Sequence, residues 1–161
     1  MRSVLALLGQ VPGVHRAGLA LAEGGGGRLL FCASDRDNER GVGWCGIVAS
    51  EHVPLNHSAR SGEAVVGSLD ELACRYPAFT TRQSSNIRPL AALPILAASH
   101  IQGGYVLFYD TPQPFDRPQL TELEDLAARL GADLRRVQRT TTHASGSLDD
   151  EPARHAALST T

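Results

Sequence analysis

Two apolar segments of strand length, separated by a short polar gap, constrain the fold of this chain more than any other feature. The first segment covers residues 90–98 and the second covers residues 103–110, with Ser99, His100 and Gln102 between them. Apolar runs of this length that are joined by a few polar residues are typical of a β-hairpin. We therefore expect the hairpin, near Leu93 and Val106, to be the spine of a sheet that is covered by helices.

A long amphipathic helix is predicted after the hairpin, over residues 116–139. Asp116 and Gln119 form a capping pair at its start, and its apolar residues then repeat at intervals of three and four: Leu120, Leu123, Ala127, Leu130, Leu134 and Val137. Such a seam can pack on the sheet or pair with the helix of a second copy. A weaker stripe is available for the second contact, so we expect both contacts and a homodimer: Leu126, Ala128, Gly131 and Ala132.

Gly131 predicts a close contact within this helix. Glycine in a helix interior costs roughly 1 kcal/mol relative to alanine. We therefore expect another element to pack closely against the helix at this position.

The first half of the chain predicts short strands and helices. We expect a helix over residues 2–10, strands over residues 14–22, 28–34, 47–49 and 64–66, and a polar loop over residues 35–40. Asn56 is expected to cap a short helix that ends at Arg60. Ser68 and Glu71 form a capping box for a helix that Pro77 ends, and a polar loop is expected over residues 80–86.

Two glycine-rich stretches raise the question of a phosphate site. Residues 24–27 are four glycines, but no Lys follows them and a strand comes next, which favours a hairpin turn. Residues 41–46 match G-x-G-x-x-G literally, yet a strand follows where a dinucleotide site requires a helix. We interpret this stretch as a loop, on which Trp44 either packs in the core or forms a pocket wall.

Composition excludes several classes of function. A chain of 161 residues favours one domain, and a net charge of −2 argues against a nucleic-acid surface. All fifteen basic residues are Arg, so lysine chemistry is excluded. Cys32, Cys45 and Cys74 form no CxxC pair, which favours reduced thiols in the cytoplasm over a disulfide framework or a metal site. No run is long enough to span a membrane.

Several segments, in this order, resemble a GAF domain, a small-molecule sensor module of signalling proteins. Residues 61–66 are similar to its "tGepv" strand, residues 90–95 to its "vPL" strand, and residues 103–108 to its "iGvLvl" strand. The segment from Pro114 to Leu130 resembles the entry to its C-terminal helix. The resemblance covers about residues 4–139, and we expect residues 140–161 to be a disordered tail or linker.

The resemblance implies an α/β (α+β) sandwich with a central antiparallel sheet of about six strands. The terminal helices would cover one face, and the short helices and loops of the middle third would cover a ligand pocket on the other. By position in this architecture, we expect five residues to line that pocket: Trp44, His57, Tyr76, Phe79 and Arg88. The chain lacks the NKxDE pattern of the cyclic-nucleotide-binding members, so the ligand and any cofactor stay open.

The resemblance leaves three functions to distinguish. The first is a regulatory sensor without catalytic or metal-binding residues. The second is a thiol enzyme, because Gly43–Gly46 is similar to the "GvCG" element of free methionine-(R)-sulfoxide reductases, whose second cysteine motif is absent here. The third is a dimerisation module that binds no ligand.

Overall fold

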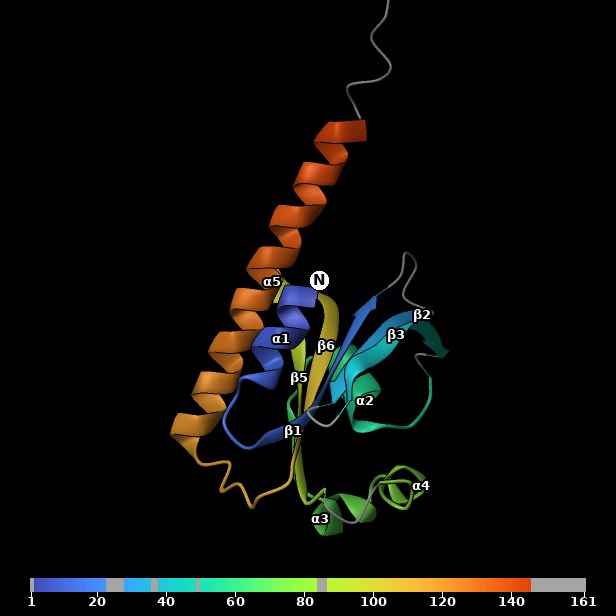
Figure 1. Cartoon of the computed structure of the whole chain (residues 1–161), viewed down its shortest axis with the longest axis vertical. Coiled ribbons are helices and arrows are strands. Elements are labelled where there is room, and N and C mark those ends of the chain that lie inside the picture. Colours follow the sequence, from blue (N-terminus) through green and yellow to red (C-terminus); the bar gives the residue numbers. More distant parts are fainter. Residues whose placement is uncertain (1, 23–27, 36–37, 49, 84–86, 146–161) are drawn as a thin grey trace, which may run out of the picture.

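The structure is a computed structural model of the chain, and it describes residues 2–22, 28–35, 38–48, 50–83 and 87–145. The elements follow one another along the sequence (Figure 1): α1 (Arg2–Gly9), β1 (Val14–Ala22), β2 (Arg28–Asp35), β3 (Asn38–Val48), α2 (Pro54–Ser61), β4 (Val65–Ser68), α3 (Leu69–Ala73), α4 (Pro77–Thr80), β5 (Pro89–Ala97), β6 (His100–Tyr109) and α5 (Arg117–Ser145).

The predicted hairpin is confirmed as the spine of the sheet. β5 and β6 pair antiparallel, with Leu93 opposite Tyr105 and Ala92 opposite Val106. The six strands of the sheet lie in the order β3-β2-β1-β6-β5-β4, and each neighbouring pair is antiparallel. Ala98 and Ser99 connect β5 to β6 with positive φ at both positions, which is the backbone of a tight hairpin turn.

Alternate residues of the central strands face two separate cores. Successive side chains of a strand point to opposite faces. The odd-numbered residues of β1, β5 and β6 share one core with α1 and α5, and Val14 joins them because the register of β1 shifts after it. The even-numbered residues share the other core with the middle elements, including Leu55 and Ala59 of α2, Leu72 of α3 and Tyr76. The predicted sandwich, with terminal helices on one face and short helices on the other, is therefore confirmed.

Two close contacts fasten α5 to the sheet. The Tyr105 hydroxyl donates a hydrogen bond of 2.6 Å to the backbone carbonyl of Leu123. Eight residues further along the helix, Gly131 lies against the backbone carbonyl of Leu96, where a Cβ atom would collide with that oxygen. The close contact predicted from Gly131 is confirmed.

The heptad seam of α5 packs on its own sheet. Leu123, Ala127, Leu130 and Leu134 are buried there, and Val137 is exposed. The weaker stripe divides between the two sides of the helix. Leu126 and Gly131 are buried toward the sheet, whereas Ala128 and Ala132 are exposed. The helix also continues to Ser145, six residues beyond its predicted end, because no Pro or Gly interrupts residues 140–145.

Three predictions about the first half are wrong in detail. β3 covers residues 38–40 of the predicted polar loop and the whole predicted glycine-rich loop. Pairing with β2, from Arg28 opposite Val48 to Asp35 opposite Asn38, outweighs weak local strand propensity there. α2 begins at Pro54, whose fixed φ suits a first helical turn, rather than after Asn56. The helix after Ser68 ends at Ala73 instead of reaching Pro77. The predicted turn at residues 24–27 lies outside the described residues.

Candidate functional site

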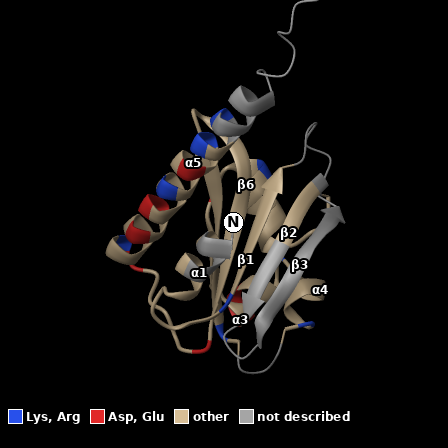
Figure 2. Ribbon diagram, turned by 45° about the horizontal axis from the view of Figure 1, so that its top comes forward, with Lys and Arg blue, Asp and Glu red and all other residues tan. Residues whose placement is uncertain are grey.

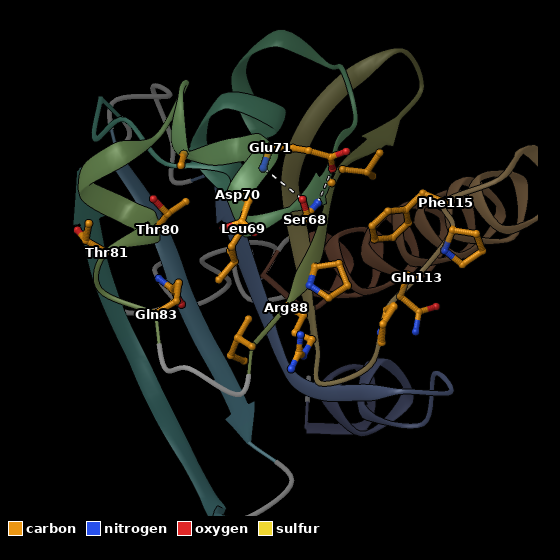
Figure 3. Close-up of a pocket in the computed structure, with 17 residues that line it drawn as sticks. Ser68, Leu69, Asp70, Glu71, Thr80, Thr81, Gln83, Arg88, Gln113 and Phe115 are labelled. Carbon is orange, nitrogen blue, oxygen red and sulfur yellow. Dashed lines mark hydrogen bonds between the residues drawn. The ribbon is translucent and has the colours of Figure 1, made fainter.

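A broad hollow of about 870 Å³ lies at one end of the sheet, beside α3 and α4. Its walls come from the end of β4, from the short helices, from the start of β5 and from the segment that leads from β6 into α5 (Figure 3). Its polar lining residues include Ser68, Asp70, Glu71, Thr80, Thr81, Gln83, Arg88 and Gln113.

Local hydrogen bonds shape the α3 wall of this hollow. The predicted capping box is present: the Glu71 N–H donates to the Ser68 hydroxyl at 3.2 Å, and the Ser68 N–H donates to the Glu71 carboxylate at 2.8 Å. The second bond is the main reason that the pKa of Glu71 is lowered from its usual value. Because the carboxylate already accepts this bond, Glu71 serves as a structural cap of α3.

The α4 side of the hollow offers hydroxyl groups that already have partners. Thr80 and Thr81 both donate to the Pro77 carbonyl at 3.1 Å. Gln83 donates through its Nε2 to the Phe79 carbonyl at 3.0 Å. These side chains therefore form a fixed polar wall.

The opposite wall is a segment held in an unusual backbone conformation. Phe115 has a φ of 45°, a left-handed value that residues other than glycine rarely adopt. Its N–H donates to the Gln119 side chain at 2.9 Å, and its ring packs edge-on against Tyr109, with ring centres 5.9 Å apart. The Asp116 side chain accepts from the Gln119 N–H at 3.0 Å, as the predicted capping pair requires. These contacts place Gln113 and Pro114 at the rim.

Arg88 is the strongest candidate for a ligand-binding side chain in this hollow. Its backbone is held on both sides, because its N–H donates to the Tyr109 carbonyl at 3.0 Å and its carbonyl accepts from the Leu69 N–H at 2.8 Å. The side chain is exposed, and within the described part of the chain no residue forms an ion pair with it. Figure 3 draws Arg88 and Glu71 at opposite ends of the hollow. A guanidinium placed in this way can bind a carboxylate or phosphate through two hydrogen bonds.

The structure distributes the five residues predicted to line a pocket over several places. Arg88 lines the large hollow, whereas His57 lines a smaller one of about 340 Å³ beside α2. Tyr76 is only 1% exposed and belongs to the core below α2, and Phe79 packs on Phe108 at the edge of that core. Trp44 belongs to β3, whose side chains lie outside the described part.

His57 and Tyr76 do lie close together. Their rings meet edge-on with centres 6.1 Å apart, and the centre of the His52 ring lies 4.9 Å from that of Tyr76. His52 donates through Nε2 to the Arg75 carbonyl at 2.7 Å. Burial raises the pKa of Tyr76, and its hydroxyl has no hydrogen-bond partner among the described residues. The three rings of His52, His57 and Tyr76 form a packed aromatic cluster.

Sequence reasoning missed the part of the hollow contributed by residues 112–115. Pro112 and Pro114 indicate a corner between a strand and a helix, but a corner alone does not indicate a binding surface. The sequence signal for this wall is the run of residues 112–115, in which Gln113 stands between the two prolines and Phe115 follows them. Polar and aromatic residues on a proline-stiffened segment are well placed to line a site.

No protein-family model matches this sequence, and no curated protein sequence matches it either. Solved structures do share its fold. The GAF domain of a phosphoenolpyruvate-protein phosphotransferase from Acinetobacter is 18% identical, with a TM-score of 0.64 over 90% of this chain and 82% of that chain. The GAF-B domain of DevS from Mycobacterium smegmatis is 16% identical, with a TM-score of 0.62 over 87% of this chain and 95% of that chain.

An enzyme is among the structures with this fold. The free methionine-R-sulfoxide reductase from Neisseria meningitidis, solved in complex with its substrate, is 19% identical, with a TM-score of 0.61 over 86% of this chain and 77% of that chain. Together these structures show that the chain has the GAF-domain fold, as the resemblance implied. No helix in the described part is long and apolar enough to cross a membrane.

Proposed function

We propose that this chain is a regulatory module that binds a small anionic or zwitterionic molecule in the hollow around Arg88. The observation that carries the proposal is that Arg88, an exposed residue whose backbone is fixed by two hydrogen bonds, lines a hollow of about 870 Å³. A volume of this order is enough for a metabolite-sized ligand. Asp70 and Glu71 on the same lining favour a ligand that also carries a hydrogen-bond donor or a positive charge.

The position of the hollow also suggests how binding would be transmitted. Its rim includes residues 112–115, which lead directly into α5. A ligand that contacts Gln113 or Phe115 would therefore act on the start of the long helix. We propose that α5 carries the signal, that two copies pair through it, and that the protein works in the cytoplasm, where the exposed thiol of Cys74 stays reduced.

Thermal-shift measurements test the ligand-binding part of this proposal. The purified chain is screened with a panel of small carboxylates, phosphate esters and amino acids, and each hit is quantified by calorimetry. Replacing Arg88 by Ala should weaken a hit by at least about tenfold, because a hydrogen bond to a charged group contributes about 1.5–3 kcal/mol.

The matched control is Arg60→Ala, which removes the same charge from the smaller hollow. If the Arg60 variant loses the ligand while the Arg88 variant retains it, the site has been placed in the wrong hollow. If no compound binds at all, the ligand-free dimerisation module becomes the better explanation.

The enzymatic alternative is supported by the fold of the Neisseria reductase alone. Cys45 lies in β3, and Cys74 directly follows α3. The sequence lacks the second cysteine motif of these reductases. The absence of this motif favours a regulatory module over an enzyme that uses two thiols. A reductase assay with free methionine sulfoxide should therefore show no turnover, and thiol-dependent turnover would contradict the proposal.

A further inference from the structure

We propose that two copies of the chain pair antiparallel through the outward face of α5, with Asp125 of one copy opposite Arg135 of the other. This inference rests on the homodimer proposed above. It goes beyond that proposal because it assigns the face of the helix, the orientation of the two copies and the residues that specify both.

The face that remains available on α5 is the one turned away from the sheet. The apolar seam is buried against the sheet from Leu123 to Leu134, so this part of it cannot also serve a second copy. Exposed residues on the other side repeat at intervals of three and four and form a continuous stripe, the outward face: Thr121, Asp125, Ala128, Ala132, Arg135 and Arg139. Glu124 and Arg136 flank this stripe and are also exposed.

Charges are distributed along the outward face with opposite signs at its two ends. On the outward face, Asp125 lies in the first half of α5, and Arg135 and Arg139 lie in the second half. Along the helix as a whole, acidic and basic residues alternate (Figure 2). Asp125 and Arg135 are each five positions from Leu130, and Glu124 and Arg136 are each six positions from it. If a second helix runs in the opposite direction and is centred on the same residue, Leu130, acidic residues of one helix therefore lie level with basic residues of the other.

An antiparallel pair uses this complementarity fully. If a two-fold axis passes level with residue 130, each residue lies opposite the one equally far on the other side, and every contact occurs twice. Asp125 then faces Arg135 of the second copy, and Ala128 faces Ala132. Two alanines at the centre allow the helices to approach closely. In a parallel, in-register pair, Asp125 would instead face Asp125 and Arg135 would face Arg135, which is unfavourable.

The dipole of a single helix does not explain this pattern. It favours acidic residues in the first turn and basic residues in the last turn, and the effect decays within those turns. Asp125 is the ninth residue of α5, and Arg135 lies ten residues before its end. Arg136 also pairs with Asp133 of the same helix at 3.9 Å, so the specificity rests mainly on Asp125 and Arg135.

Charge-reversal variants of the whole chain test the inference by sedimentation equilibrium over a range of concentrations. One helix face per copy makes a small interface, so we expect a weak dimer that dissociates further as salt is added. Asp125→Arg and Arg135→Asp should each weaken it by about tenfold, because each change converts two attractive contacts into repulsive ones. The double variant restores both contacts and should return to within about threefold of the parent.

Glu122→Arg is the matched control for Asp125→Arg, because it makes the same change in net charge on an exposed residue outside the stripe. It should leave the dimer unchanged. Thermal unfolding of each variant at a concentration where the parent is monomeric confirms that the fold is intact.

Two results would overturn the inference, and they separate it from the proposed function. A dimer that both single variants leave unchanged, or that the double variant fails to restore, rules out this face and orientation and leaves the dimer itself standing. A chain that stays monomeric at every concentration overturns the inference and the proposed dimer together. Neither result bears on the ligand, because Arg88 tests that separately.

Discussion

Replacing Tyr105 by Phe isolates one of the two contacts that fasten α5 to the sheet. The change keeps the buried ring and removes only the hydroxyl that donates 2.6 Å to the Leu123 carbonyl. That carbonyl lies within α5 and retains its helical partner, so no acceptor is left without a bond. A hydrogen bond of this kind contributes about 0.5–1.5 kcal/mol net. We expect the free energy of unfolding to fall by about 1 kcal/mol and the melting temperature to fall by roughly 2–8 °C.

Tyr109→Phe is the matched control for this prediction. Tyr109 lies four residues further along β6, is equally buried, and its hydroxyl has no hydrogen-bond partner among the described residues. Removing a buried hydroxyl without a partner relieves its desolvation, so stability should stay unchanged or rise by up to about 1 kcal/mol.

Urea unfolding of the two variants, followed by circular dichroism at neutral pH, measures the difference directly. A Tyr109 variant that loses as much stability as the Tyr105 variant would refute the reasoning. That result would mean that both substitutions destabilise the chain for a common reason, and that the hydrogen bond from Tyr105 to α5 makes no measurable contribution of its own to the free energy of unfolding.

Three further predictions concern the helices and alkaline pH. Gly131→Ala places a Cβ against the Leu96 carbonyl, so urea unfolding should show a loss of about 1–3 kcal/mol in stability. Alanine normally favours a helix over glycine, so a stabilised variant would contradict the close packing. Ser68→Ala removes the acceptor of the capping box, and it should cost about 1 kcal/mol and speed amide exchange in residues 69–73; unchanged exchange would refute that role. Burial raises the pKa of Tyr109 from its usual 10 to about 12, so the folded chain holds that proton longer than the unfolded chain, and stability should fall as pH rises from 10 to 12. Tyr109→Phe should make that fall shallower, and an identical slope would exclude the contribution.

Local patterns in the sequence predicted the elements whose apolar residues carry a clear period or a capping signal. The hairpin follows from its two apolar runs, α5 follows from its seam, and the start of α3 follows from Ser68 and Glu71. In each case the residues that form the sequence pattern are also the ones that pack in the core or cap the helix. The local preference and the tertiary packing therefore favour the same structure.

β3 could not be predicted in the same way. Its residues from Asn38 to Gly46 are mostly polar or glycine, and they become a strand because they pair with β2, although two irregularities interrupt the register. Pairing of this kind is a tertiary effect that leaves little trace in composition.

The candidate site was predicted less well than the fold for a related reason. Arg88 was expected only from its position in the architecture that the resemblance implies. The hollow around it depends on residues 112–115, whose course is set by the left-handed backbone of Phe115 and its packing on Tyr109. No local rule predicts such a conformation for a phenylalanine.

An NMR titration tests the proposed binding site most directly. The ¹⁵N-labelled chain would be titrated with each compound that raises its melting temperature, and the backbone amides and the Arg88 Nε–H signal would be followed. We predict that shifts concentrate at residues 67–71, at Arg88 and at residues 113–115, with smaller changes along the first turns of α5. Shifts confined to residues 50–61, or an Arg88 signal that does not move at saturation, would contradict the proposed site.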